Sequence, residues 1–245
     1  MLNMKNISVT TTLDNLIEGD SRLDATYYAS AVFHVHKILD EYKNSGHKIK
    51  TIGDLSQHTF NPPPIKRIFT DDKLVRTPYM LPQEMFDFYW APRKFVLAHK
   101  MDKIEDWFLK ENWVVLTQSG SVGKPYFVTK NDENIILSQN AIRIPPINPE
   151  VGGYIYAYLS TWLGQTLLKK DEFGITVKHI RPNQVDNIPI PDIEDSIKKR
   201  ISDKIKTAFE LRKKAIALID EAKSMIYNEI GAPHENIYDE EDIEE

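Results

Sequence analysis

The sequence predicts a mixed α/β (α+β) fold, in which a globular domain is followed by a long C-terminal coiled-coil helix. Two stretches with apolar residues at helical spacing, 24–43 and 154–170, alternate with short runs of β-branched and aromatic residues. After Pro191 the pattern changes, and residues 193–230 contain neither glycine nor proline. An uninterrupted stretch of this kind is typical of one long helix.

Composition and charge define three parts: the globular domain over 1–191, a dimerisation or spacer helix over 192–231, and an acidic tail over 232–245 that we expect to be disordered. The net charge of the 245 residues is -5, but the tail alone carries seven acidic residues and no lysine or arginine, so that the remaining residues carry +2. This balance neither requires nor excludes a nucleic-acid partner.

Several classes of protein are excluded by what the sequence lacks. The absence of cysteine rules out disulfides, thiolate catalysis and cysteine-ligated zinc. No run of 18 apolar residues and no secretory leader is present, so we expect a cytoplasmic protein without membrane association.

The first half of the chain yields one helix and little regular structure after it. The helix over 24–43 should stop at Asn44-Ser45-Gly46, and a strand is expected over 49–52. Residues 61–95 are rich in proline and aromatic residues and predict irregular loops with short strands.

The stretch WVVLTQSGSVGKPYFV, residues 113–128, predicts two strands joined by a glycine turn. We expect Gly120 and Gly123 to adopt positive φ, and the hydroxyls, amide and ammonium of the turn suit phosphate or nucleic-acid edges. Residues 135–137 and 141–144 predict a second pair of strands around Ser138-Gln139-Asn140, and residues 154–170 predict one helix with Trp162 on its apolar face.

In the terminal helix, Asp192 is expected to be the N-cap, with Asp195 three residues later. One apolar stripe then runs along it: Ile197, Ile201, Ile205, Ala208, Phe209, Ala215, Ile216, Ile219, Ala222 and Ile226. A helix of roughly 57 Å cannot bury this stripe against a compact domain, so we expect a partner helix. The alternative is a helix that breaks and folds back, but 193–230 contains no helix breaker.

Four enzyme-like patterns fail on inspection. Gly123-Lys124 lacks the earlier glycine and the following Ser or Thr of a phosphate-binding loop, and Asn61-Pro62-Pro63-Pro64 lacks the aromatic residue that stacks on an extruded base in amino-methyltransferases. On one helix Asp192 and Glu221 would lie roughly 43 Å apart and could not share a metal ion. Ser119 and Ser121 lack the context of a nucleophile elbow. We therefore predict a non-catalytic protein with no metal and no cofactor of its own.

The segments that remain, taken in order over residues 21–226, resemble one half of the specificity (S) subunit of type I restriction–modification enzymes. They are Ser21–Tyr28, Ile52–Leu55, Thr117–Lys124, Ser138–Asn140, Gly174–Ile180 and Asn187–Pro191. The resemblance implies a target-recognition domain that reads double-stranded DNA, and a helix that sets the spacing between two such domains and docks DNA methyltransferase subunits. S-adenosylmethionine would belong to the methyltransferase partner.

A complete subunit of this family usually has two domains and two helices, whereas this chain has one of each. Antiparallel pairing of two copies through 193–230 would restore the two-domain layout and read two half-sites of a bipartite target. A separate, non-identical partner is the alternative. The chain could also be a protein-interaction module acting through its helix, or the recognition half of a fused methyltransferase/endonuclease.

Candidate DNA contacts divide into residues for phosphates and residues for bases. Lys66, Arg67, Arg93, Lys94, Lys124, Lys178 and Arg181 are the cationic candidates for phosphate, and Ser119, Ser121 and His179 lie in turns similar to those of the family. Gln139 and Asn140 could make bidentate contacts to adenine, and Arg67 or Lys178 could address guanine. The partner-helix candidates are Ile197, Ile201, Ile205, Ala208, Phe209, Ile216, Ile219 and Ile226.

Overall fold

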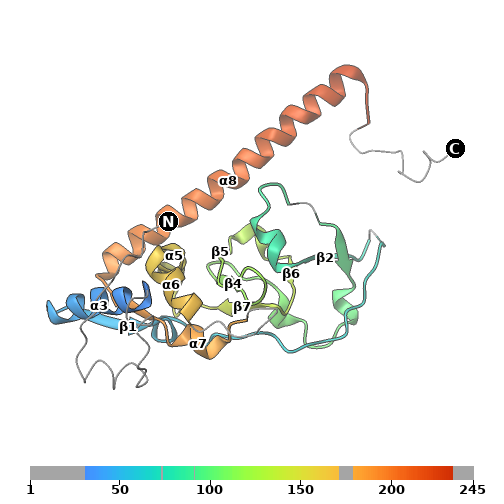
Figure 1. The fold of residues 1–245 in the computed structure, drawn as a ribbon. Coiled ribbons are helices and arrows are strands. Elements are labelled where there is room, and N and C mark those ends of the chain that lie inside the picture. The colour runs from blue at the N-terminus through green and yellow to red at the C-terminus, as the bar shows by residue number, and fades with distance from the viewer. Residues whose placement is uncertain (1–30, 73, 91, 171–178, 234–245) are drawn as a thin grey trace, which may run out of the picture. The chain divides into compact units, whose positions relative to one another are not determined.

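A computed structural model describes residues 31–72, 74–90, 92–170 and 179–233 (Figure 1). The chain divides into two units, Met1–Lys206 and Thr207–Glu245. The predicted mixed α/β fold with a long C-terminal helix is confirmed. Ser21–Tyr28, Gly174–Lys178 and most of the acidic tail lie outside the described residues.

In the described part of the first unit, helix α3 (Ala31–Asn44) is followed by strand β1 (Lys48–Thr51) and the short helix α4 (Ile52–Leu55). Strand β8 (Pro189–Asp192) pairs antiparallel with β1, so that residues 138 to 144 positions apart form one two-stranded sheet. Thr51 caps α4, because its hydroxyl accepts from the Asp54 backbone N–H at 3.2 Å while the Asp54 carboxylate accepts from the Thr51 backbone N–H at 2.8 Å.

Two further sheets hold the centre of the unit. Strands β5 (Pro125–Phe127), β4 (Val114–Thr117) and β7 (Ala141–Ile144) form one sheet in this order, and β3 (Lys94–Val96), β2 (Thr77–Met80) and β6 (Ile136–Leu137) form the other. The predicted hairpin over 113–128 is confirmed by the antiparallel β4–β5 pair. Four 3₁₀ helices connect the described strands: η1 (Pro82–Phe86), η2 (Ala98–Lys100), η3 (Glu105–Trp107) and η4 (Lys130–Asp132).

The prediction that 135–137 and 141–144 pair with each other is wrong. β6 pairs with β2, whereas β7 pairs with β4, so the chain crosses between sheets at Ser138–Asn140. The fully buried guanidinium of Arg143 makes this crossing possible, since it donates hydrogen bonds to the carbonyls of Leu137 (2.5 Å), Ser138 (3.0 Å) and Ala141 (2.6 Å). Burial lowers the pKa of Arg143 to about 9, against the opposing charges of Tyr79 and Asp106, and the side chain remains cationic at neutral pH.

The predicted helix over 154–170 is two helices, α5 (Pro149–Ser160) and α6 (Trp162–Lys170). α5 starts earlier than predicted because Asn148 caps it, accepting from the Glu150 N–H at 3.0 Å. Thr161 ends α5 in an extended conformation, and its hydroxyl then accepts from the Gly164 N–H at 3.2 Å. Trp162 is 59% exposed, so its predicted place on the buried face is wrong.

Helix α7 (Pro182–Asp186) leads into β8, and α8 then runs unbroken from Asp195 to Ile230. The unbroken helix rules out the alternative that breaks and folds back. Asp192 is not its N-cap, because Asp192 ends β8 and the carbonyl of Glu194 accepts the first bonds of the helix, from the N–H groups of Ile197 (2.9 Å) and Lys198 (3.0 Å).

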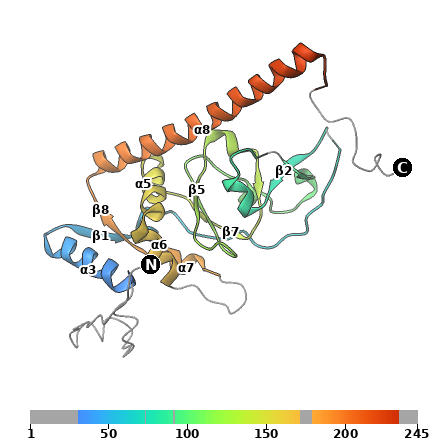
Figure 2. The same cartoon turned by 45° about the horizontal axis from the view of Figure 1, so that its top comes forward.

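The first turns of α8 belong to the first unit and lie beside α5 (Figure 2). Gly153 permits this approach, because a Cβ at this position would lie 2.5 Å from Ser202 Cα. The Ser202 hydroxyl accepts from the Tyr154 N–H at 3.0 Å and donates to the Glu150 carbonyl at 2.5 Å. The helix therefore docks here through Lys198 and Ser202, which are buried, whereas Ile197 of the predicted stripe is 40% exposed.

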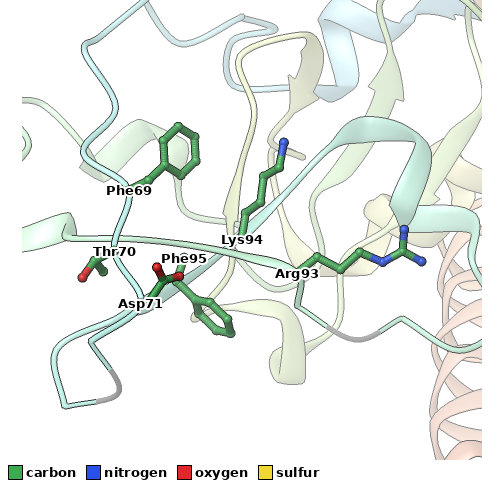
Figure 3. Close-up of a pocket in the computed structure, with 6 residues that line it drawn as sticks. All are labelled: Phe69, Thr70, Asp71, Arg93, Lys94 and Phe95. Carbon is green, nitrogen blue, oxygen red and sulfur yellow. The ribbon is translucent and has the colours of Figure 1, made fainter. Parts of the chain in front are cut away.

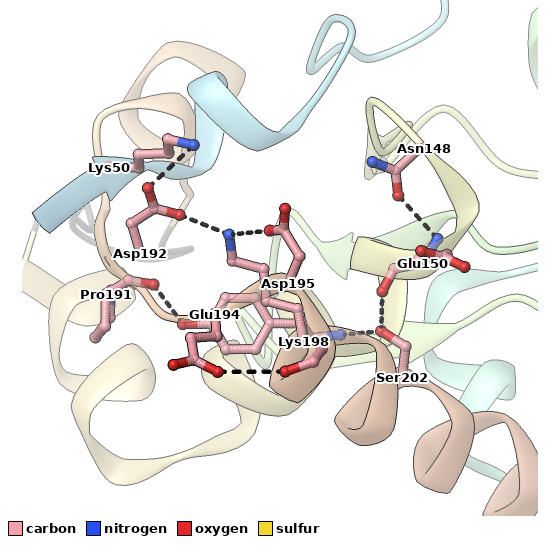
Figure 4. A network of polar contacts seen from close by, with 11 residues as sticks. Lys50, Asn148, Glu150, Pro191, Asp192, Glu194, Asp195, Lys198 and Ser202 are labelled. Atoms are coloured by element: carbon pink, nitrogen blue, oxygen red, sulfur yellow. Dashed lines mark hydrogen bonds and ion pairs between the residues drawn. The ribbon is translucent and has the colours of Figure 1, made fainter.

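A polar network fixes the start of α8 (Figure 4). The Lys198 ammonium lies 2.5 Å from the Asp192 carboxylate and 2.9 Å from that of Asp195, and Lys50 of β1 lies 3.2 Å from Asp192. Tyr154 and Tyr158 donate their hydroxyls to the carbonyls of Pro191 and Pro189, at 2.6 and 2.8 Å. The network ties together α5, the β1–β8 sheet and the base of α8.

Candidate nucleic-acid interface

The turn between β4 and β5, residues 118–124, is held in one conformation by Thr117. The Thr117 hydroxyl donates to the Ser121 carbonyl and accepts from the Lys124 N–H at 3.0 Å, and the Thr117 carbonyl accepts from the Gly123 N–H at 2.9 Å. Gly120 and Gly123 have φ of 72° and 75°, which confirms their predicted conformation. A Cβ at Gly120 would meet no atom within 4 Å, so the backbone there is open to a close approach.

Three segments that are distant in sequence meet around Gln118. Its backbone N–H donates to the Asn140 carbonyl at 3.3 Å, and its carbonyl accepts from the Ile180 N–H at 3.2 Å. Ser119 and His179 form an antiparallel bridge beside it. The predicted residues Ser119, Ser121, Lys124, Gln139, Asn140 and His179 are thus brought together in one group, which we call the turn cluster.

Asn61 connects these turns from a fourth segment. Its amide Nδ2 donates to the Gln139 carbonyl at 3.0 Å, to the Ala141 carbonyl at 2.7 Å and to Gln118 Oε1 at 3.1 Å. Asn61 is half-buried, and its role could not be read from the Asn-Pro-Pro-Pro sequence, because all three acceptors lie 57 to 80 residues away. The local pattern indicates only a proline-rich loop.

The chemistry of the turn cluster is that of amides, hydroxyls and cations. Residues 117–124, 138–141 and 179–181 contain Lys124, His179 and Arg181 and no carboxylate. The Lys124 ammonium lies 5.6 Å from the centre of the Phe86 ring, and the backbone N–H of Arg181 donates to Gln184 Oε1 at 2.8 Å. Such a surface matches phosphates and the donor and acceptor edges of bases. Lys178 lies outside the described residues.

The other four predicted cations lie at a different place, beside the β3–β2–β6 sheet. Residues 68–70 extend this sheet past β3, since the Thr70 N–H donates to the Phe95 carbonyl at 3.0 Å and the Leu97 N–H to the Ile68 carbonyl at 2.9 Å. An open pocket of about 330 Å³ lies between the two segments (Figure 3). Its lining residues are Phe69, Thr70, Asp71, Arg93, Lys94 and Phe95.

Aromatic side chains contact two arginines beside this sheet, Arg67 and Arg76. Arg67 donates to the Tyr79 hydroxyl at 3.0 Å, and Tyr79 is the cross-strand partner of Lys94. Arg76, which the sequence analysis missed, lies 3.9 Å from the centre of the Phe95 ring. No local signal identifies Arg76, because its stacking partner Phe95 lies 19 residues further on, in β3. Lys66, Arg67, Arg93 and Lys94 are all exposed and form the cationic group.

The predicted stripe of α8 differs in exposure along its length. Ile201, Ile205, Phe209 and Ile216 are half-buried, whereas Ala208 is exposed, and Ile219 and Ile226 are 40% and 60% exposed. Other apolar side chains of the second unit are exposed as well, at Leu211, Leu218, Met225 and Ile230. An exposed apolar set of this size on a helix is typical of an interaction surface.

Within the described part of the chain, no group of three His, Asp or Glu side chains could hold a metal ion. The helices described there include none long and apolar enough to cross a membrane.

The sequence matches the model of one protein family. The family model "Type I restriction modification DNA specificity domain" matches residues 44–221. No curated protein sequence matches the chain significantly.

Three solved structures are similar in part. The type I restriction–modification S subunit from M. genitalium is 18% identical, with 74% of this chain and 44% of that chain covered and a TM-score of 0.43. The HsdS subunit from Thermoanaerobacter tengcongensis is 15% identical, with 83% and 50% covered and a TM-score of 0.42. A chain of a type I R-M system solved for its complex assembly and conformational transition is 12% identical, with 88% and 54% covered and a TM-score of 0.46. This chain spans about half the length of each.

Because the family model covers most of the chain and the turn segments lie where it matches, this chain belongs to the family of type I restriction modification DNA specificity domains.

Proposed function

We propose that this chain is the DNA-sequence-recognition component of a type I-like restriction–modification methyltransferase complex. The observation that carries the proposal is the turn cluster, in which three separate turns and Asn61 are hydrogen-bonded into one surface of amides, hydroxyls and cations without a carboxylate. Methyl transfer, with S-adenosylmethionine as donor, would be carried out by a partner subunit. The chain itself would bind and position the DNA.

In this proposal the two groups of side chains do different work. Gln139 and Asn140 lie in the crossing held by Arg143, so their backbone is fixed before DNA arrives, and their amides suit bidentate contacts to adenine. The exposed Lys66, Arg67, Arg93, Lys94 and Lys124 suit phosphates, which set the register without reading sequence.

Binding is expected to be sequence-selective and steeply dependent on salt. If about six cations contact phosphates, affinity should fall on the order of 10³-fold between 50 and 200 mM salt, because bound counterions are released. The measurement is fluorescence anisotropy with a duplex obtained by selection from a random library, using the chain together with a methyltransferase subunit. Gln139→Ala and Asn140→Ala should each relax the preference at one base position by about 1–3 kcal/mol.

Two double variants test the role of charge. The first replaces Lys66 and Arg67 by glutamate, and the control replaces Lys37 and Lys43 of α3 by glutamate. All four residues are exposed and each variant changes the net charge by the same amount, so that only the place of the change differs. The first variant should weaken binding and reduce the salt dependence, and the second should do neither. A salt-insensitive interaction, or a selection that yields no preferred sequence, would contradict the proposal.

We further propose that α8 pairs antiparallel with a second copy, so that two recognition domains read a bipartite site with a fixed spacer and dock the methyltransferase subunits. The apolar residues exposed in the second unit support this role, since an isolated helix would leave them in water. In a closed two-fold pair, the same apolar surface of each copy would also be buried by the other copy.

Aspartate at Ile219 and Ile226 is expected to convert the assembly to monomer. Burial of each isoleucine on association stabilises it by about 1.5–3 kcal/mol, and a charge in the same place adds a desolvation cost. Sedimentation velocity of the purified chain, alone and with a methyltransferase subunit, measures the effect, and Lys214→Asp, an exposed position on α8, is the control. If wild-type protein is monomeric under both conditions, pairing of α8 is refuted.

A second candidate function is a protein-interaction module that acts through α8 alone, which the same exposed apolar residues favour. Two results taken together distinguish the interaction module from the DNA-recognition component. If charge reversal at Lys66 and Arg67 leaves DNA binding intact while Ile205→Asp abolishes activity, the interaction module is the better description.

A further inference from the structure

Gln118 is the residue at the centre of the turn cluster, and its side-chain amide has a fixed direction. Asn61 Nδ2 faces two backbone carbonyls, those of Gln139 and Ala141, and a carbonyl can only accept. The group at Asn61 that faces them is therefore the amide nitrogen. Gln118 meets the same nitrogen at 3.1 Å, so it must present its oxygen, Oε1.

With its oxygen turned toward Asn61, Gln118 presents its amide nitrogen to a ligand. Among residues 31–72, 74–90, 92–170 and 179–233 there is no acceptor for Gln118 Nε2. The side chain is half-buried, and its backbone is held from both sides by Asn140 and Ile180. It is thus a fixed donor at the surface where the turns meet.

We infer that Gln118 is a base-reading residue that acts as a hydrogen-bond donor, and that Asn61 is the positioning residue that sets this polarity. The inference rests on the proposed function in DNA recognition. A glutamine with both amide atoms available can contact adenine in a bidentate manner, accepting from N6 and donating to N7. Because Gln118 turns Oε1 toward Asn61 and presents Nε2, it reads a base-edge acceptor: purine N7, guanine O6 or thymine O4 in the major groove.

This assignment separates Gln118 from its neighbours Gln139 and Asn140. Asn61 binds the backbone carbonyl of Gln139 and leaves the Gln139 side chain untouched. The local sequence Thr-Gln-Ser-Gly gives no sign of the difference, because the polarity of Gln118 is imposed by a residue 57 positions away.

The test is selection from a random duplex library by the full chain with a methyltransferase subunit, comparing wild type with Gln118→Glu. A glutamate at this position still accepts from Asn61, so the turns stay connected, but it offers no donor. We expect the selected site to change at one base position, toward a base with a donor such as cytosine N4, and affinity for the wild-type site to fall on the order of ten- to a hundredfold. Gln83→Glu, at an exposed glutamine of η1, makes the same change in charge and should leave the site unchanged.

Asn61→Ala provides the second variant. Without its amide the Gln118 side chain can rotate, so preference should broaden at the same base position that Gln118→Glu alters. Thermal unfolding of each variant reports separately on whether the domain is folded, and Gln118→Glu keeps the test valid if Asn61→Ala is unstable.

Each outcome has one meaning. A wild-type chain that selects no sequence refutes the proposed function itself. A wild-type chain that selects a site which Gln118→Glu then binds unchanged refutes the inference alone. A uniform loss of affinity with the selected site unchanged identifies a phosphate contact and also overturns base reading by Gln118.

Discussion

Replacement of Lys198 by methionine is expected to lower the free energy of unfolding by about 3–5 kcal/mol, the cost of removing one partner from a buried ion pair. The Lys198 side chain is 4% exposed and that of Asp192 15%, so little water could replace the lost ammonium. Urea unfolding followed by circular dichroism measures the change. Lys199→Met is the matched control, because its ion pair with Glu150 lies in solvent, and it should have little effect.

Asp192→Asn in the Lys198→Met background should restore most of the lost stability. The single substitution leaves a carboxylate partly buried with only Lys50 beside it, 3.2 Å away, whereas the double substitution removes the charge as well. Replacing a whole buried pair is often close to neutral, although breaking it is not. If the double variant is as unstable as the single one, packing of the Lys198 stem and not its charge explains the loss.

The same pair predicts the dependence of stability on pH. Burial of Asp192 favours the neutral acid, but hydrogen bonds and charge from Lys198 and Lys50 outweigh it and lower the pKa of Asp192. The contribution of Asp192 to the free energy of unfolding is therefore fully present above its unfolded-state pKa of about 3.9, and it is lost as the pH falls through its pKa in the folded protein. Burial of Lys198 favours the neutral amine, but Asp192 and Asp195 outweigh it and raise the pKa of Lys198.

The contribution of Lys198 is accordingly present below the unfolded pKa of about 10.4 and is lost as the pH rises through the folded value. The difference in unfolding free energy between wild type and the double variant should be flat from about pH 5 to 9 and should shrink at both extremes. A difference that changes near neutral pH would show that another group is involved.

Gly153→Ala is expected to destabilise the protein by about 1–3 kcal/mol, the usual cost of overpacking. Alanine is a better helix former than glycine by about 0.8–1 kcal/mol, so propensity alone predicts the opposite sign. Packing should prevail, because the new Cβ would lie 2.5 Å from Ser202 Cα, 2.9 Å from its Cβ and 3.0 Å from its carbonyl oxygen. The start of α8 would have to move away from α5.

Urea unfolding again measures the effect, with Ser160→Ala as the control at an exposed position of the same helix. This control should change stability by less than about 0.5 kcal/mol. A stabilised Gly153→Ala variant would show that α8 can shift without cost and that the glycine is not needed for docking. In the Gly153→Ala variant, movement of α8 would break the hydrogen bond that the Tyr154 N–H donates to the Ser202 hydroxyl in the wild-type protein.

Features set by neighbouring residues could be predicted from the sequence. The hairpin over 113–128 and the positive φ of Gly120 and Gly123 follow from a turn whose chemistry is local. The unbroken α8 follows from the absence of breakers over 36 residues. The fold brings the predicted site residues Ser119, Gln139, Asn140 and His179 into one cluster, and their contact with DNA stays a prediction.

Features that depend on distant segments could not be predicted in this way. The pairing of β6 with β2 and of β7 with β4 depends on which sheet each strand reaches, and two short apolar runs carry no information about that choice. Gly152 and Gly153 look like helix breakers, yet they lie inside α5, because Asn112 and Ser202 leave no room for a side chain there.

By itself the sequence of this protein determined the local elements and the long helix, since each depends on interactions between near neighbours in the chain. Only the tertiary structure decided that Asn61 and Arg143 hold the turns, that α8 docks through Lys198 and Ser202, and that Gln118 presents its amide nitrogen. The physical reason is that a hydrogen bond or a close packing contact needs both partners. The partners of Asn61 and Ser202 lie 48 to 80 residues away, and those of Arg143, although near in sequence, are placed by the crossing between two sheets.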